Sequence, residues 1–311
     1  MWKAIVDVIV VTYNRKTLLT ECLDALQNQT YPVHKIIIID NASTDGTKEV
    51  VEEKQYNNLE YILMESNTGG AGGFYHGLKK GREEDCDWLW LMDDDTIPHP
   101  DSLEKLINGI DIINKKSLNP IGFVASTVFG PDNECMNVPG ILLTPSENGY
   151  PRWYRLLAES IVELESATFV STLVNKNAVL KCGLPCRDYF IWGDDTEYTM
   201  RISKNYGSGY FIGNSKVIHK RLNAKALDIT YEDNDNRLKM YHLLYRNGAI
   251  NEMVYNGKSC LYVFVKGIQM SLKMLAKGSG AKKMLIVLKG YLEAISQYKR
   301  FKRYIENQIS N

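Results

Sequence analysis

Short apolar runs and longer segments of helical periodicity alternate along the first 118 residues. The runs are rich in β-branched residues and predict buried strands at 4–12, 35–39, 59–64 and 87–92. The segments repeat apolar residues every three or four positions and predict helices at 16–28, 44–55, 74–84 and 100–115. Because strands that alternate with helices form βαβ units, this part predicts an α/β fold whose mostly parallel sheet is flanked by helices.

The pattern changes after Pro120. Shorter strands between turn-rich loops are predicted at 122–129, 168–174, 210–212 and 215–218, and a helix is predicted at 195–206. From about Arg237 the chain is predicted to be helical to its end, with a break at 277–280. We therefore expect one domain over 1–236, made of the halves 1–118 and 119–236, and a helical C-terminal region over 237–311.

The charges balance, but they are unevenly placed. Lys and Arg number 37 and Asp and Glu number 37, so the formal net charge is zero. Segment 258–311 holds eleven basic residues against two acids, which leaves a net charge of −9 on residues 1–257. The balance excludes a basic field over the whole chain, so we expect no nucleic-acid partner.

Composition narrows the class of protein further. Hydrophobic residues make up 44% and charged residues 24%, which is typical of a globular protein and excludes disorder and collagen-like repeats. Six scattered cysteines without a CxxC pair indicate free thiols rather than a disulfide scaffold. Asp7 interrupts the first apolar run, which argues against a signal peptide, and no apolar stretch reaches about 18 residues. We expect a cytoplasmic protein.

Polar residues follow each of the first four predicted strands. Ligands of open parallel sheets bind outside the carboxyl ends of the strands, so these segments are expected to meet at one edge. They are residues 12–15, 40–46, 67–73 and 93–96.

Three adjacent aspartates stand directly after the fourth predicted strand. Asp93, Asp94 and Asp95 repel one another unless a cation neutralises them. Asp93 and Asp95 fall on the same face of an extended segment, from which their oxygens can bind a divalent metal. The alternative is a solvated acidic turn that caps the next helix. The preceding buried strand and the nearby glycine-rich segment favour the metal site.

Three further features have both a structural and a functional interpretation. The glycine run 69–73 lets backbone amides approach a ligand, or is a flexible turn, and it matches neither a dinucleotide fingerprint nor a P-loop. Asp194 and Asp195 begin a predicted helix, where they either cap it or remove a proton from a nucleophile. His219 ends a predicted strand as a structural residue or as a metal ligand.

Together these segments resemble the GT-A-fold glycosyltransferases of inverting family 2. The motifs lie in the family's order between residues 5 and 198: VIVVTYNR, IIIIDNASTDGT, NTGGAGG, LMDDDT and FIWGDDTEY. The combination of NTGGAGG, DDD and WGDDTEY is most similar to bacterial galactofuranosyltransferases and related rhamnosyltransferases. The resemblance makes residues 1–118 the nucleotide-binding half and 119–236 the acceptor-binding half.

The resemblance also implies a role for each matching residue. Asp195 is the expected catalytic base, and Asp194 and Trp192 would position the acceptor. Asp93, Asp95 and His219 would bind Mn²⁺ or Mg²⁺. The expected donor-binding residues are Thr12, Asn14, Arg15, Asp40, Asn41, Ser43, Gly69, Gly70, Gly72, Gly73 and Asp94.

The expected reaction is metal-dependent transfer of a sugar from a nucleotide donor to a saccharide or lipid-linked acceptor in surface polysaccharide synthesis. UDP-galactofuranose is the favoured donor, and dTDP-rhamnose is the alternative. Galactofuranan polymerases that resemble this chain carry an additional N-terminal domain, whereas the predicted core begins at residue 4, which implies single addition. A nucleotidyltransferase and a non-catalytic sugar-binding scaffold are the competing classes, and the oligomeric state stays open.

The basic C-terminal region also allows two interpretations. Its helices space apolar residues at near-helical intervals with lysines between them, notably over 258–277 and 282–305. Such helices either lie on an anionic membrane surface or pack on the catalytic core with a solvated basic face. In the first case the protein would be peripheral on the inner face of the cell membrane.

Overall fold

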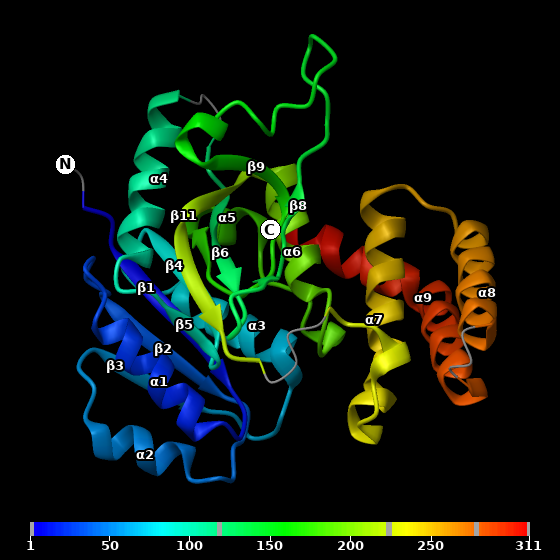
Figure 1. Cartoon of the computed structure of the whole chain (residues 1–311), viewed down its shortest axis with the longest axis horizontal. Helices are drawn as coiled ribbons and strands as arrows, with labels where there is room; N and C mark the ends of the chain where they lie inside the picture. The colour runs from blue at the N-terminus through cyan, green and yellow to red at the C-terminus, as the bar shows by residue number, and fades with distance from the viewer. Residues whose placement is uncertain (1–2, 117–119, 222–225, 277–279, 310–311) are drawn as a thin grey trace.

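The computed structural model describes residues 3–116, 120–221, 226–276 and 280–309 (Figure 1). Strands and helices alternate in the first half, as predicted. The elements of this half are β1 (Val6–Thr12), α1 (Lys16–Gln27), β2 (Lys35–Asp40), α2 (Thr47–Lys54), β3 (Leu59–Leu63), α3 (Gly69–Gly81), β4 (Trp88–Asp93), β5 (Thr96–Pro98) and α4 (Ser102–Lys116).

The second half begins with short strands and ends in long helices. Its strands are β6 (Phe123–Phe129), β7 (Cys135–Met136), β8 (Gly140–Ile141), β9 (Ile161–Ser166), β10 (Thr172–Asn175) and β11 (Gly209–His219). Its α-helices are α5 (Lys176–Cys182), α6 (Asp194–Asn205), α7 (Asp235–Tyr255), α8 (Cys260–Ala276) and α9 (Gly280–Ile309). Three 3₁₀ turns complete its described part: η1 (Leu157–Glu159), η2 (Arg187–Tyr189) and η3 (Ile229–Tyr231).

One mixed sheet forms the centre of the molecule, in the order β3-β2-β1-β4-β10-β6-β11-β9-β8. Strands β3, β2, β1 and β4 are parallel, and β11 runs parallel to β6. Strand β10 is antiparallel to both β4 and β6, so β6 and β11 point the same way as the first four strands. The predicted α/β class with a mostly parallel central sheet and flanking helices is confirmed.

Both faces of the sheet are buried, which explains the nearly continuous apolar runs of its strands. Alternate residues of β1 point to opposite sides. Val8 and Val10 belong to the cluster that packs with α1 and α4. Ile9 and Val11 belong to the cluster that includes Phe74 of α3. The sheet therefore holds the carboxyl ends of β1 and β4 rigidly at one edge.

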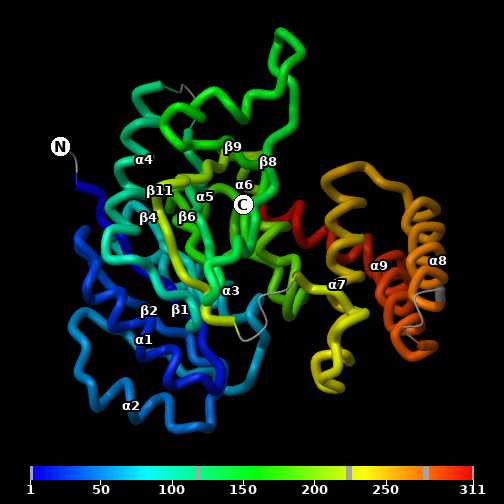
Figure 2. Tube along the Cα trace, in the orientation of Figure 1, coloured from blue at the N-terminus to red at the C-terminus, as the bar shows by residue number. Residues whose placement is uncertain are grey.

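Helices α7, α8 and α9 form a bundle beside the sheet (Figure 1). A third apolar cluster joins the bundle to the segment before α6, with Tyr189 and Phe301 among its members. Helix α9 runs back toward α5 (Figures 1 and 2), where the amide of Leu184 donates to Oε1 of Gln308 at 3.0 Å. The boundary at 236/237 stays a prediction, and residues 277–279 of the predicted break lie outside the described residues.

Several element predictions were wrong. Helix α3 begins at Gly69 rather than at residue 74, so the glycine run is helical. The strands predicted at 210–212 and 215–218 form the single strand β11, whose register against β6 shifts between Ile212 and Lys216. The strand predicted at 168–174 is limited to β10, because Ser171 has a left-handed φ of 60°. Elements β9 and α5 were not predicted.

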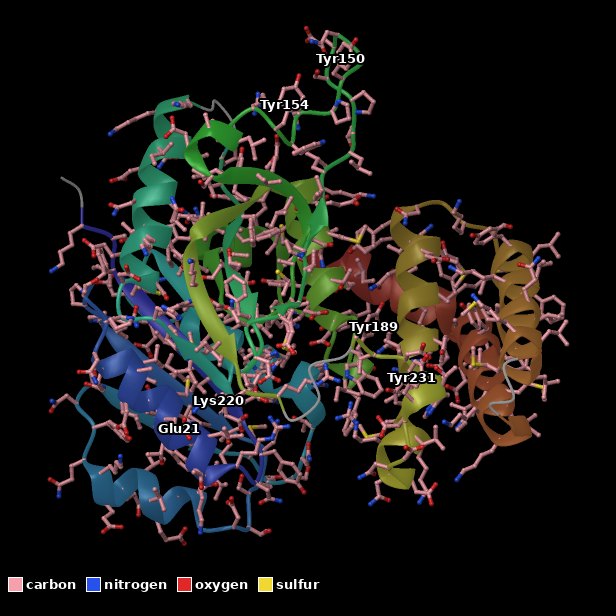
Figure 3. The ribbon with its side chains drawn as sticks, in the orientation of Figure 1. Glu21, Tyr150, Tyr154, Tyr189, Lys220 and Tyr231 are labelled. Carbon is pink, nitrogen blue, oxygen red and sulfur yellow. The ribbon has the colours of Figure 1, made fainter. Side chains whose placement is uncertain are left out.

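A long arm between β8 and β9 projects away from the sheet, with the exposed side chains of Tyr150 and Tyr154 on it (Figure 3). The described part of the chain holds no helix with the length and apolar character needed to cross a bilayer. All six cysteines are free, as expected: Cys22, Cys86, Cys135, Cys182, Cys186 and Cys260.

Candidate active site

A cavity of about 980 Å³ lies at the carboxyl ends of β1 and β4. Its walls are the start of α3, the end of β11, the segment that leads into α6, and one side of α7. Volumes of this order are typical of pockets for small molecules and cofactors. The sheet topology thus brings the predicted strand-end segments together with residues from the second half.

Asp93, Asp95 and His219 meet at the floor of this cavity. One ligand atom from each lies within 4.8 Å of the other two. Antiparallel pairing of β5 with β11 sets His219 opposite Thr96, and Nε2 of His219 lies 3.0 Å from Oδ1 of Asp95. Two carboxylates and one imidazole are a donor set that suits a divalent cation. The residues therefore fit the metal site that the sequence predicted.

The imidazole of His219 is oriented by a residue that the sequence analysis missed. Its Nδ1 lies 2.9 Å from Oδ1 of Asn137. A proton on Nδ1 that is donated to this amide oxygen leaves the Nε2 lone pair free to bind a cation beside Asp95. Asn137 lies in the loop after β7 with a left-handed φ of 49°, and no motif in the sequence marks it.

Burial disfavours the charged form of two aspartates in the triplet. It raises the pKa of Asp93 to about 7, with help from the Asp95 charge. It also raises the pKa of Asp94 to about 6, although the Arg15 guanidinium opposes the shift. For Asp95, His219 and Arg15 outweigh burial, and its pKa lies below the ordinary value. A bound cation would favour the ionised form of all three aspartates.

Asp94 points away from the metal ligands and toward the end of β1. Its Oδ2 accepts a hydrogen bond from Oγ1 of Thr12 at 2.7 Å. Nη1 of Arg15 lies 3.2 Å from Oδ1 of Asp94 and 2.7 Å from Oδ2 of Asp95. Thr12, Arg15 and Asp94 all line the cavity.

Six of the remaining predicted donor residues divide into two groups. Asn41, Gly69 and Gly70 line the cavity, and Nδ2 of Asn41 donates to the carbonyl of Gly69 at 3.1 Å. The second group is a loop network outside the lining residues. Its contacts are Ser43 N to Asp40 Oδ1 at 2.7 Å, Asn14 N to Ser43 Oγ at 2.8 Å, and Tyr61 Oη to Asp40 Oδ2.

Gly72 and Gly73 pack inside the protein and do not line the cavity. A Cβ on Gly73 would lie 2.4 Å from Cγ1 of Val11, and one on Gly72 would lie 2.3 Å from Oγ1 of Thr68. Gly73 therefore lets α3 approach β1 closely, whereas Gly72 leaves room for the side chain of Thr68 at the start of the same helix. A Cβ on Gly70, by contrast, would meet no described atom within 4 Å beyond its chain neighbours and its own helix backbone.

Asp194 and Asp195 begin α6 at the cavity wall. Burial and the charge of Asp195 raise the pKa of Asp194 well above its ordinary value, and Asp93 contributes to the same shift. Burial also raises the pKa of Asp195, against hydrogen bonds from the Thr196 amide at 2.6 Å and its hydroxyl at 3.3 Å. The arrangement favours Asp195 as the ionised member and Asp194 as the protonated one.

The segment that leads into α6 has an unusual backbone. Phe190 and Trp192 have φ values of 65° and 62°, in the left-handed region that non-glycine residues rarely adopt. Nδ2 of Asn247, on α7, donates to the carbonyls of residues 189, 191 and 192 at 3.1, 3.0 and 2.7 Å. Nδ2 of Asn251 donates to the carbonyl of Gly193 at 2.9 Å. Trp192 lines the cavity beside Tyr241.

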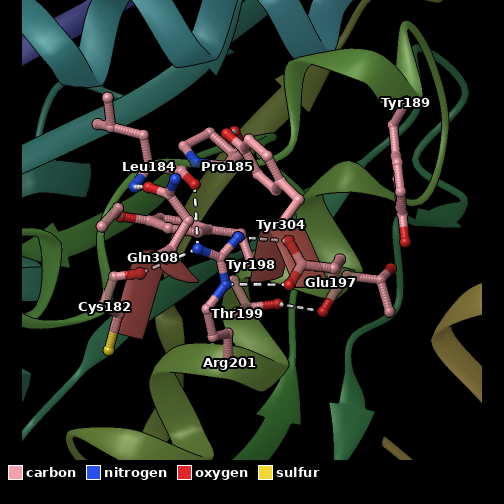
Figure 4. Close-up of polar contacts among 12 residues, drawn as sticks. Cys182, Leu184, Pro185, Tyr189, Glu197, Tyr198, Thr199, Arg201, Tyr304 and Gln308 are labelled. Atoms are coloured by element: carbon pink, nitrogen blue, oxygen red, sulfur yellow. Dashed lines mark hydrogen bonds and ion pairs between the residues drawn. The ribbon is translucent and has the colours of Figure 1, made fainter. Parts of the chain in front are cut away.

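A buried ion pair fixes α6 from its other side (Figure 4). Nη2 of Arg201 lies 2.6 Å from Oε2 of Glu197, and both side chains are fully buried. Nη1 of Arg201 donates to the carbonyls of Cys182 and Leu184 at 2.9 and 3.0 Å. The hydroxyl of Tyr255 donates to Oε1 of Glu197 at 2.5 Å. Helix α6 is therefore attached to α5 and to α7.

Comparison with known proteins agrees with this arrangement. Residues 7–139 match the model of the glycosyl transferase family 2. Galactofuranosyltransferase GlfT1 of Mycolicibacterium smegmatis is 26% identical over 211 residues, which cover 65% of this chain and 66% of the relative. Glycosyltransferase AglE of Haloferax volcanii is 27% identical over 200 residues, which cover 63% of this chain and 60% of the relative. The chain matches just under two thirds of the length of each.

Solved structures show the same fold. GalNAc-T7, crystallised with UDP, GalNAc and Mn²⁺, has a TM-score of 0.61 at 18% identity, over 99% of this chain and 58% of that one. S. aureus TarS 1-349 has a TM-score of 0.56 at 14% identity, over 97% of this chain and 91% of that one. Residues 7–139 are therefore similar to the glycosyl transferase family 2, and the chain has the GT-A fold.

Proposed function

We propose that the protein is an inverting, metal-dependent glycosyltransferase that moves a sugar from a nucleotide donor to a saccharide or lipid-linked acceptor. One observation carries this proposal. The Asp93–Asp95–His219 cluster and the Asp194–Asp195 pair lie in the walls of a single cavity. The first group can bind a cation that stabilises a leaving diphosphate. The second group can accept the proton of a nucleophilic hydroxyl.

Asp93, Asp95 and His219 would hold Mn²⁺ or Mg²⁺, which supplies positive charge to the departing nucleoside diphosphate. Asn137 would keep the imidazole in the metal-binding tautomer. Thr12 and Arg15 would hold Asp94 at the donor side of the cavity. The GalNAc-T7 structure, which contains UDP and Mn²⁺ in the same fold, supports this assignment of the metal.

Asp195 would act as the general base. It accepts the proton of the acceptor hydroxyl while that oxygen bonds to the anomeric carbon and the bond to the diphosphate oxygen breaks on the opposite face. The anomeric configuration inverts in this single displacement. Asp194 keeps its proton, because burial raises its pKa, and can donate a hydrogen bond that orients the acceptor. Trp192 would contact a sugar face.

The proposed donor site extends from the cavity into the loops after β1 and β2. Thr12, Arg15, Asn41, Gly69 and Gly70 would contact the donor directly. Asn14, Asp40 and Ser43 would form the outer wall through their own hydrogen-bond network. Gly73 would contribute only by letting α3 pack on β1, and Gly72 only by leaving room for the side chain of Thr68.

UDP-galactofuranose is the proposed donor, in the synthesis of a surface polysaccharide. Support comes from the GlfT1 proteins of two genera, whose names specify galactofuranosyl transfer and which are 26% identical to this chain. dTDP-rhamnose is the alternative that the sequence motifs left open.

A donor panel with Mn²⁺ tests the proposal. UDP-galactofuranose, UDP-galactopyranose, UDP-glucose and dTDP-rhamnose are scored for nucleotide release and sugar transfer, with UDP binding measured by calorimetry. We expect Asp195→Asn to lower transfer by about 10²–10⁴-fold and to leave UDP binding unchanged, since loss of a general base costs that much. Asp188→Asn, at an exposed aspartate outside the cavity, is the matched control.

Two results would contradict the proposal. Full transfer by the Asp195→Asn variant would show that Asp195 is not the general base. Absence of both nucleotide binding and turnover across the panel would favour the non-catalytic scaffold, and nucleotidyl transfer to a sugar phosphate would favour the nucleotidyltransferase.

A further inference from the structure

Helix α8 carries apolar side chains on two opposite faces. Its inner face packs in the bundle through Val263 and Met274, and a Cβ on Gly267 would lie 2.7 Å from Cβ of Tyr291. Its outer face is exposed to solvent, with Leu261 at 72% and Leu272 at 58%. The exposed apolar residues of this face are Leu261, Phe264, Val265, Ile268, Leu272 and Leu275.

The spacing of these residues makes them one continuous stripe. Counted from Leu261, they occur at offsets of three, four, seven, eleven and fourteen, which is the repeat of a single helix face. A helix that only packs on a core has polar residues on its solvent side, whereas α8 has large apolar ones there. An exposed apolar surface of this size marks an interaction site.

The positive charge around the stripe indicates which kind of partner the stripe binds. No Asp or Glu occurs from Lys258 to Leu292, and lysines at positions 258, 266 and 273 accompany α8. Lys266 pairs with Glu252, and Lys258 lies 4.8 Å from the ring centre of Tyr262. Two copies of this basic region would repel each other across a shared interface, whereas an anionic lipid surface would attract it.

We propose that the outer face of α8 docks on an anionic lipid bilayer and lies in the plane of its interface. The apolar stripe enters the boundary of the acyl chains, and Lys258 and Lys273 contact the headgroups. No described residue of α8 lines the active-site cavity, and α8 lies on the side of the bundle remote from the sheet (Figure 1). Docking through this face therefore leaves the cavity free to bind donor and acceptor.

Flotation of the full chain with vesicles tests the proposal. We expect binding to vesicles of phosphatidylcholine with phosphatidylglycerol, and at least tenfold weaker binding to phosphatidylcholine alone. The double variant L261E/L272E should lose at least tenfold in binding to the anionic vesicles. Leu180→Glu is the matched control, because Leu180 is also an exposed leucine on a helix, and it should bind within twofold of the parent.

Both target leucines are exposed, so the substitutions should leave the thermal midpoint and nucleotide binding unchanged. No binding to anionic vesicles, or equal binding by L261E/L272E and the parent, would overturn the proposal. Equal binding to neutral vesicles would overturn its anionic component. A dimer in light scattering that L261E/L272E disrupts, without vesicle binding, would overturn the proposal and assign the face to a second copy of the chain.

Discussion

The two neighbouring aspartates at the start of α6 have different surroundings, which shift their pKa values to different extents. Asp194 is buried and coupled to the charges of Asp195 and Asp93, so its pKa rises furthest. Asp195 accepts hydrogen bonds from Thr196, which favour its ionised form. These surroundings favour the protonated form more strongly for Asp194 than for Asp195, which is the division that the proposed base-catalysed transfer would use.

The pKa of Asp195 predicts how activity depends on pH. Burial raises this pKa above the ordinary 3.8, and a protonated carboxyl cannot accept the acceptor's proton. We expect kcat/KM at saturating Mn²⁺ to fall with decreasing pH through this raised pKa, earlier than for an ordinary aspartate. Thr196→Val removes a hydrogen bond that lowers the pKa, so its acid limb should move to higher pH. An acid limb that does not move would contradict the assignment of this titration to Asp195.

Asn137 allows a test of the metal site that does not touch the ligands. Substitution to Gly suits its left-handed backbone and removes the amide that orients His219. We expect the Mn²⁺ affinity to fall by about 10–100-fold, as for other partners of metal-binding histidines. Calorimetric titration with Mn²⁺ measures this. Asn133→Gly, at a second left-handed asparagine of the same connection, should bind Mn²⁺ like the parent.

At the scale of elements, α6 depends on the buried Glu197–Arg201 pair. Removal of one partner of a buried pair leaves an uncompensated charge and costs about 3–5 kcal/mol. We therefore expect Arg201→Met to lower the free energy of unfolding by about this amount in a urea titration. Lys302→Met removes an exposed pair with the same i,i+4 spacing and should change stability by less than about 0.5 kcal/mol. Similar losses in both variants would show that Arg201 has no special role.

Comparison of elements shows where sequence patterns suffice. The first four strands and the motif residues at their ends were predictable, because buried parallel strands are continuous apolar runs and their carboxyl ends share one edge. The start of α3 was not predictable from residues 69–73, since glycine disfavours helix by about 1 kcal/mol per residue. Close packing of Gly73 on Val11 overrides that preference, and only the folded structure shows this contact.

The three asparagines of the site that were not predicted were missed for the same physical reason. Asn137, Asn247 and Asn251 act through hydrogen bonds to segments that are distant in the sequence. An isolated asparagine in a loop or helix carries no local pattern that reveals such a partner. By contrast, Asp93 and Asp95 were predicted as metal ligands because they follow a buried strand, and the family resemblance added His219.

In the molecule as a whole, the acidic and basic residues that cancel in the net charge lie in different places. The acidic residues of the cavity belong to the part of the chain with a net charge of −9, and the basic residues gather in the C-terminal helices. These helices are more than an addition to a finished domain, because α7 supplies one wall of the cavity. The sequence boundary at 236/237 therefore divides residues that line the same cavity.

Substitution of Asn247 tests whether the C-terminal helices contribute to the active site. Three carbonyls of the segment before Asp194 accept hydrogen bonds from its Nδ2, and two residues of that segment hold left-handed backbone. Asn247→Ala should let the segment relax and displace Asp195, which lowers kcat by about 100-fold for a displacement of about 1 Å. UDP and Mn²⁺ affinities should stay unchanged, because their proposed ligands lie at the strand ends, in the loops that follow them and at the start of α3.

Steady-state kinetics and UDP calorimetry on the folded variant measure these quantities, with Asn236→Ala at an exposed position of α7 as the control. A general loss of folding would lower the fraction of protein that binds UDP, whereas displacement of Asp195 lowers kcat alone. If kcat is preserved while only the thermal midpoint falls, Asn247 is a packing residue. The loss of kcat with intact donor binding would instead show that the C-terminal region positions the catalytic carboxylate.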